Sequence, residues 1–195
     1  KYIFTGVLGL VFVFMFLTSG ESKDSVDPID KNKDHDQKRS EEIKEGYQKI
    51  NENHLAEVIK SYNDQASAQI IAQKLNRFAS SYDVNPFVIA GMIYQESTFN
   101  QKASGNAGEV GLMQISEIAL EEVNRVYDME YIPSYLSQIG YNLKAGILYY
   151  KRCKSLADNI REALAYYNDW LNDPDFDYAD EVLAKSRRIK TRYYE

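Results

Sequence analysis

The sequence predicts an all-α protein, and three observations lead to this fold class. The 195 residues include only 4 prolines and 10 glycines, which leaves long stretches free of helix breakers. Apolar residues recur at three- and four-residue spacings, the period of an amphipathic helix. There is no strong alternating pattern of the kind that marks strands, and no internal repeat. We therefore expect one helical domain, from about residue 65 to residue 195.

The helices are expected in a fixed order along this domain. Ala68, Ile71, Leu75, Ala79 and Tyr82 mark the first amphipathic helix. Asn-Pro at 85–86 is a helix start, because proline is well tolerated at a first helical position. The expected helices are 68–82, 87–96, 112–123, 141–154, 160–170 and 178–190, and the second of them is apolar enough to be central.

Three segments precede this domain. Residues 2–20 carry no charge, so 1–20 is a signal peptide or a membrane anchor, in contact with the membrane through 2–18 if it is uncleaved. Residues 21–40 are rich in charges of both signs and poor in aliphatic side chains, which predicts a flexible spacer. Residues 41–64 have a roughly helical pattern and are expected to form a linker helix. The remainder of the chain is then extracytoplasmic, either membrane-anchored or secreted.

Composition excludes several classes of function. The formal charge of −6 argues against nucleic-acid binding, which needs clustered Lys and Arg. The single cysteine, Cys153, excludes an intramolecular disulfide and a cysteine-based zinc site. His35 and His54, the two histidines, lie upstream of the motifs described below, so a catalytic triad or a histidine-rich metal site is not expected. We expect no cofactor and no metal, and chemistry carried by carboxylates, amides and tyrosines.

Glu96 is the candidate catalytic residue. It ends a mostly apolar helix, where partial desolvation raises the pKa of a carboxyl group and keeps a proton available. A protonated carboxyl group is the first requirement for cleaving a glycosidic bond. The alternative for this residue taken alone is an ordinary solvated glutamate at a helix end.

Other motifs add groups suited to binding a saccharide. Gly111 to Gln114 combines a glycine, which permits close approach of backbone to ligand, with a side-chain amide. Tyr167 and Asn168 place an aromatic ring beside a second amide. Ordinary core packing is the alternative for most of the 16 tyrosines.

These residues resemble a known family. Gln-Glu-Ser-x-Phe-Asn at 95–100 and Ala-Gly-x-x-Gly-Leu-Met-Gln-Ile at 107–115 are similar to the signature of SLT-type soluble lytic transglycosylase catalytic domains. Asn-Leu-x-x-Gly-x-x-Tyr at 142–149 and Ala-Tyr-Tyr-Asn at 165–168 resemble two later elements. The resemblance spans about 68–190 and implies a goose-type-lysozyme-like fold that acts on peptidoglycan.

The resemblance also implies roles for individual residues. Glu96 matches the catalytic acid and base. The residues that match substrate-binding positions are Ser97, Met113, Gln114, Tyr167, Asn168 and Tyr178. The sequence departs from the family at Gly105, where serine is usual, at Glu109, where alanine is common, and at 169–172, which replaces a glycine-rich continuation.

Three functions remain open on this basis. The first is a lytic transglycosylase that cleaves the bond between N-acetylmuramic acid (MurNAc) and N-acetylglucosamine (GlcNAc) and leaves 1,6-anhydro-MurNAc ends. The second is a lysozyme-type hydrolase in which Glu109 is the second carboxylate. The third is a catalytically silent peptidoglycan-binding module. A helical adaptor acting through 41–63 would explain none of the motifs, and the sequence identifies no protein partner.

Overall fold

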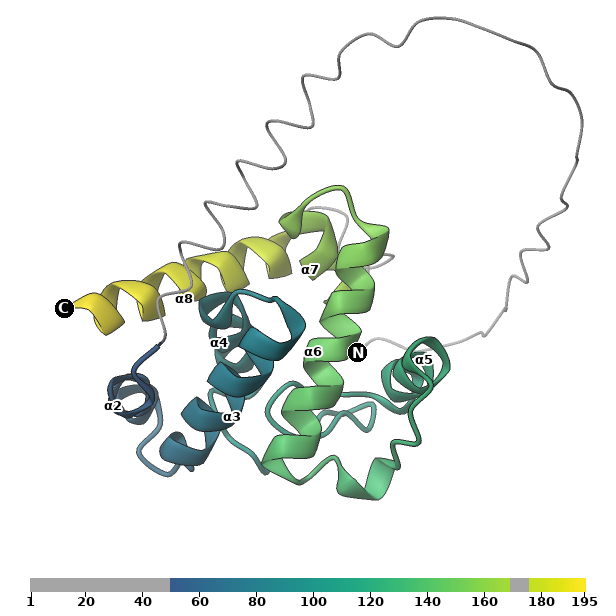
Figure 1. Cartoon of the computed structure of the whole chain (residues 1–195), viewed down its shortest axis with the longest axis horizontal. Coiled ribbons are helices and arrows are strands. Elements are labelled where there is room, and N and C mark those ends of the chain that lie inside the picture. Colours follow the sequence, from purple (N-terminus) through teal and green to yellow (C-terminus); the bar gives the residue numbers. More distant parts are fainter. Residues whose placement is uncertain (1–49, 169–175) are drawn as a thin grey trace, which may run out of the picture. The chain divides into compact units, whose positions relative to one another are not determined.

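The computed structural model describes residues 50–168 and 176–195 (Figure 1). The predicted signal or anchor, the predicted spacer and residues 169–172 lie outside these ranges, as do the first residues of the predicted linker helix. The described helices are α2 (Glu52–Tyr62), α3 (Ala68–Tyr82), α4 (Pro86–Ser97), α5 (Glu117–Tyr127), η1 (Pro133–Tyr135), α6 (Ile139–Leu156), α7 (Ile160–Asn168) and α8 (Asp177–Tyr194).

The described residues confirm the all-α fold class. They form helices joined by turns, and their extended pairing is limited to isolated bridges from Val110 to Ser104 and to Ile115. Both bridges lie in the loop that contains the Gly111 to Gln114 motif. The one β-like element described is therefore a small loop at the candidate site.

Helix α4 is the central helix, as its composition predicts. The Asn85 side chain caps its start by accepting hydrogen bonds from the backbone N–H groups of Phe87 (2.9 Å) and Val88 (3.4 Å), and Pro86 occupies the first turn. Every residue from position 86 to position 93 is buried. An apolar helix that is buried all round forms the middle of a core rather than one face of it.

Helix α8 packs closely against α4 (Figure 1). At Gly91 an added Cβ atom would lie 2.7 Å from the carbonyl oxygen of Val182 and 2.9 Å from the backbone nitrogen of Ser186. These distances leave no room for a side chain, so glycine allows the two backbones to meet. The close approach brings the start of α8 beside the end of α4, where Glu96 lies.

Helix α2 belongs to the same compact unit as the later helices. Its Leu55 and Ile59 are 1% and 0% exposed, and the helix packs on α3 and α8. The backbone N–H of Asn51 donates a 2.7 Å hydrogen bond to the Tyr193 hydroxyl near the end of α8. The predicted boundary near residue 65 therefore falls between two helices, α2 and α3, that pack on each other.

One expected helix begins later than its apolar pattern suggests. Residues 112–114 form a turn, Ile115 pairs with Val110, and α5 starts only at Glu117, with the Ser116 hydroxyl accepting a 3.1 Å hydrogen bond from Ala119 N–H. Gly111 and Gln114 have φ angles of 80° and 43°, and this left-handed backbone cannot continue a helix. The other helices agree with expectation to within a few residues, with α7 described to Asn168 and α8 to Tyr194.

Candidate active site

Glu96 lies in the last turn of α4, and the chain turns sharply just after it. Thr98 and Phe99 follow the helix with φ angles of 49° and 58°. This conformation is strained for residues that carry a Cβ atom, and for a β-branched residue above all. Burial offsets the strain, since Phe99 is fully buried and its ring stacks on that of Tyr94 at 5.9 Å between centroids. The turn ends α4 with Glu96 half-buried.

The environment of the Glu96 carboxyl group favours its protonated form. Burial is the largest cause and raises the pKa of Glu96 to about 7 from an ordinary 4.5. The negative charge of Glu109 adds to this rise, while the hydrogen bond from Tyr178 and the positive charge of Lys185 oppose it. The direction is the one that the sequence predicts for an acid at the end of an apolar helix.

Tyr178, in the first turn of α8, donates its hydroxyl hydrogen to Oε1 of Glu96. Tyr178 is only 8% exposed, and burial raises its pKa well above the ordinary value for a tyrosine, with the Glu96 charge as the next cause. The phenol therefore stays protonated and remains a hydrogen-bond donor. Tertiary packing joins these two residues, which lie far apart in the sequence.

Tyr167 is buried under the glycine-containing loop. Its hydroxyl donates a 2.8 Å hydrogen bond to the backbone carbonyl of Met113, and its ring lies 5.2 Å from that of Tyr149. Burial, followed by the charge of Glu96, raises the pKa of Tyr167 well above its ordinary value. The hydroxyl of Tyr167 therefore holds the loop in place.

A buried asparagine fixes the same loop from α6. Asn142 is 1% exposed, accepts a 2.9 Å hydrogen bond from Met113 N–H and donates to the carbonyls of Val110 (2.7 Å) and Leu136 (3.0 Å). A Cβ atom at Gly111 would lie 2.5 Å from Nδ2 of Asn142, so a side chain there would break this arrangement. Asn142 thus holds both sides of the loop that contains Gln114.

Ser97 and Met113 act within this framework. The Ser97 hydroxyl lies 3.0 Å from the carbonyl of Ile93 and 2.8 Å from that of Leu112, which links the end of α4 to the loop. Met113 is fully buried, with its side chain against Gly146 of α6. Both residues are placed to support the site from within the protein.

Gln114, Asn168 and Glu109 are the more accessible members of the predicted site. Gln114 is half-buried, and its Nε2 donates a 2.9 Å hydrogen bond to the Gly111 carbonyl. Asn168 is exposed at the end of α7. Glu109 is half-buried, and its Oε2 accepts a 3.1 Å hydrogen bond from Ala107 N–H. Their polar groups are suited to hydroxyl-rich ligands.

A family comparison agrees with this arrangement. Residues 73–173 match the family described as the transglycosylase SLT domain. The chain belongs to the transglycosylase SLT domain family. The matched range includes Glu96, Glu109, Gln114 and Tyr167, whereas Tyr178 follows it.

Solved structures of SLT lytic transglycosylases share the fold of this SLT domain. The lytic transglycosylase Slt of Pseudomonas aeruginosa, solved as an inactive mutant, is 21% identical and has a TM-score of 0.56, over 62% of this chain and 24% of that one. The 70 kDa soluble lytic transglycosylase of Escherichia coli is 19% identical with a TM-score of 0.56, over 61% of this chain and 24% of that one. This chain therefore spans about a quarter of these structures, and the likeness confirms the all-α, lysozyme-like fold.

Two residues of this SLT-domain site were given no role from the sequence. Asn142 stands in a recognised motif, and that motif is the sequence signal that could have pointed to its role. Lys185 of α8 gave no such signal. Its Nζ donates to the side-chain oxygen of Gln95, next to Glu96, and this contact depends wholly on the packing of α8 against α4.

Among the described residues, no group of three or more His, Cys, Asp or Glu side chains is placed to hold a metal ion. Cys153 is buried, and burial raises its pKa to about 12, which keeps the thiol protonated.

Within 50–168 and 176–195, no helix is both long and apolar enough to cross a membrane. The predicted anchor at 2–18 falls outside those residues and stays a prediction.

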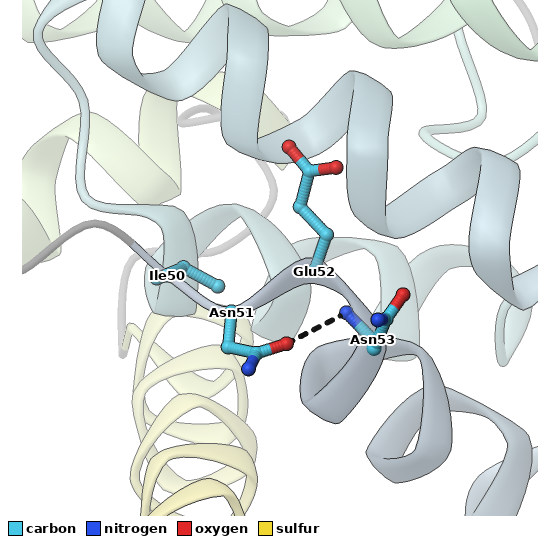
Figure 2. Close-up of a pocket in the computed structure, with 4 residues that line it drawn as sticks. All are labelled: Ile50, Asn51, Glu52 and Asn53. Atoms are coloured by element: carbon cyan, nitrogen blue, oxygen red, sulfur yellow. Dashed lines mark hydrogen bonds between the residues drawn. The ribbon is translucent and has the colours of Figure 1, made fainter.

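An open pocket lies apart from this constellation of residues. Figure 2 shows it at the start of α2, with a volume of about 480 Å³ and lined by Ile50, Asn51, Glu52 and Asn53. The Asn51 side chain caps α2 there by accepting a 3.0 Å hydrogen bond from Asn53 N–H. The pocket contains none of the predicted site residues and begins where the described residues begin.

Proposed function

We propose that the protein is a peptidoglycan lytic transglycosylase in which Glu96 is the general acid and then the general base. The observation that carries this proposal is the state of Glu96. It is half-buried, it accepts a hydrogen bond from Tyr178, and its pKa is raised to about 7. At pH 7 about half of such a carboxyl group is protonated, against roughly 0.3% for a pKa of 4.5.

The reaction needs one carboxyl group and no water. Glu96 gives its proton to the oxygen that links MurNAc to GlcNAc, and the bond from that oxygen to C1 of MurNAc breaks. The resulting carboxylate takes a proton from the C6 hydroxyl of the same MurNAc, whose oxygen bonds to C1. The products are a 1,6-anhydro-MurNAc end and a free GlcNAc hydroxyl, and Glu96 is again protonated. A pKa near 7 suits both steps, because the group is a donor first and a base afterwards.

The proposed substrate contacts follow from accessibility. Gln114 and Asn168 present amides that can exchange hydrogen bonds with sugar hydroxyls and acetamido groups. Ser97, Met113 and Tyr167 position the loop through the contacts described above, and Tyr178 orients the Glu96 carboxyl group. Because peptidoglycan lies outside the cytoplasmic membrane, we place the activity there, with export or anchoring through residues 1–20.

Incubation of the full chain with purified peptidoglycan sacculi tests this proposal. Mass analysis of the released muropeptides should show anhydro ends, which are lighter than reducing ends by one water. Glu96→Gln should lower release by about 10²–10⁴-fold, while Glu121→Gln, at an exposed glutamate of α5, should leave it unchanged. Near-normal release by folded Glu96→Gln protein would refute the assignment of the acid.

A lysozyme-type hydrolase is the second candidate, and one observation favours it. The charge of Glu109 acts on the pKa of Glu96, so a second acid lies within electrostatic reach of the first. In an inverting hydrolase such an acid would activate water on the far side of the sugar. Reducing ends from the unmutated protein would select this mechanism, and absence of any release would select a silent binding module.

A further inference from the structure

Two of the three departures from the family pattern, those at Gly105 and Glu109, meet in space. A Cβ atom added to Gly105 would lie 2.1 Å from Oε2 and 2.9 Å from Cδ of Glu109, and 3.1 Å from Oε1 of Gln114. The Glu109 carboxylate therefore occupies the volume that a side chain at position 105 would fill. Gly105 does not have a left-handed φ angle, unlike Gly108 and Gly111, so a side chain here would conflict with the Glu109 side chain and not with the backbone conformation.

The surrounding loop holds Glu109 in this position. Gly105 N–H donates a 2.8 Å hydrogen bond to the Glu109 carbonyl, and Ala107 N–H donates a 3.1 Å bond to the Glu109 carboxylate. A further backbone bond of 2.8 Å, from Gly111 N–H to the Ala103 carbonyl, closes the loop around them. The carboxylate is thus fixed both by its own side-chain bond and by the pairing of its backbone.

We propose that Gly105 and Glu109 form a matched pair, in which the missing side chain at 105 admits a second carboxylate beside Gln114. In this arrangement Glu109 is a positioning residue, which acts through Glu96 by helping to keep the proton on its carboxyl group. The proposal deepens the proposed function and rests on it, because it takes Glu96 to be the acid. It assigns a role to two of the positions at which this chain departs from its family.

The groups that face Glu96 define what Glu109 contributes. From α8, Tyr178 donates a hydrogen bond to Glu96 and Lys185 adds a positive charge, and both favour the ionised carboxylate. From α7, Tyr167 is electrostatically coupled to Glu96 and stays neutral. Among the described residues, Glu109 is the charged neighbour that favours the protonated form of Glu96, alongside burial. Without the Glu109 charge, the effects of Tyr178 and Lys185 would lower the pKa of Glu96 and favour its ionised form.

This contribution serves both halves of the proposed reaction. A higher pKa keeps more Glu96 protonated when substrate arrives, and it makes the resulting carboxylate a stronger base towards the C6 hydroxyl. Glu109 itself neither gives nor takes a proton in this scheme. Both its carboxylate and the Gln114 side-chain amide lie beside Gly105, so a substrate group bound by Gln114 would lie near this negative charge.

A direct titration tests the pair without any substrate. The pKa of Glu96 is measured by NMR on full-length protein labelled with ¹³C at glutamate side-chain carboxyl groups, with assignment by loss of its signal in Glu96→Gln. In Glu109→Gln, which keeps the side-chain shape, the pKa of Glu96 should fall by about 0.5 or more. In Glu121→Gln it should not change. An unchanged pKa of Glu96 in folded Glu109→Gln protein would overturn the proposal.

A double-mutant cycle tests the role of Gly105. Gly105→Ser should displace the Glu109 carboxylate and lower the pKa of Glu96, whereas the same change should have little effect in a Glu109→Ala background, where the space is empty. Equal shifts in both backgrounds would overturn the pairing of the two positions.

Activity profiles then separate this inference from the proposed function. The alkaline limb of kcat/KM on sacculi should move to lower pH in Glu109→Gln. If the unmutated protein releases no anhydro ends, the proposed function fails while the titration still decides whether the pair exists. If anhydro ends appear but the pKa of Glu96 does not depend on Glu109, the pair fails and the proposed function stands.

Discussion

Asn142→Ala should destabilise the protein and disable the site together, because this one buried side chain of α6 makes two hydrogen bonds to the loop around Gln114 and a third to the segment just before α6. The bonds join Asn142 to Met113 N–H at 2.9 Å and to the carbonyls of Val110 and Leu136 at 2.7 and 3.0 Å. At 1% exposure the asparagine is out of reach of bulk water. Alanine would leave one donor and two acceptors without their partner.

The size of the effect follows from these three groups. Each buried polar group that loses its partner costs about 1–3 kcal/mol, and water entering the vacated space recovers part of that. We expect a loss of about 3 kcal/mol in the free energy of unfolding, a large share of the roughly 5–15 kcal/mol that a domain possesses. With an m-value of about 2 kcal/mol/M, the urea midpoint would fall by about 1.5 M.

Asn124→Ala provides the matched control. Asn124 also bridges a loop through its side chain, accepting from Tyr131 N–H and donating to the Tyr131 carbonyl, both at 2.8 Å, but it supports a different loop. Both variants should unfold at lower urea. Under conditions where each is fully folded, only Asn142→Ala should lose kcat/KM on sacculi, by about tenfold or more. Equal activity of the two folded variants would show that the Asn142 bonds stabilise the protein without positioning the site.

Further expectations concern the ionisation of the site and the route of the chain. For the unmutated protein kcat/KM should fall as pH rises through about 7, because the general acid loses its proton around the pKa of Glu96, and a flat profile from pH 5 to pH 9 would contradict this. Tyr178→Phe removes a hydrogen bond that favours the carboxylate, so the pKa of Glu96 should rise and the alkaline limb should move to higher pH, opposite to Glu109→Gln. A topology reporter fused after Ser40 should be active outside the cytoplasmic membrane, and activity inside would contradict the predicted export.

Single residues show how far the sequence reaches into the site. Glu96 became the candidate acid from sequence because it ends an apolar helix and because the motifs at 107–115 and 165–168, with the family resemblance they carry, accompany it. The start of α5 could not be predicted, because the left-handed backbone at Gln114 interrupts an apolar pattern that would otherwise continue as helix. The supporting role of Met113 was equally hidden, since an apolar residue beside a glycine can either line a groove or fill a core, and contact with Gly146 decides between them.

The sequence by itself determined the helical fold class, the central position of α4, the family and the residue proposed as the acid. These features depend on local periodicity, on residues adjacent in the chain and on motifs that keep their spacing. Only the tertiary structure decided which groups surround Glu96. Tyr178 and Lys185 lie near Glu96 because glycine at position 91 lets α8 approach α4. The Glu109 carboxylate lies where it does because Gly105 has no side chain to fill that space. The pKa of an acid depends on all charges and donors within a few ångströms, and that set is fixed by how distant segments pack.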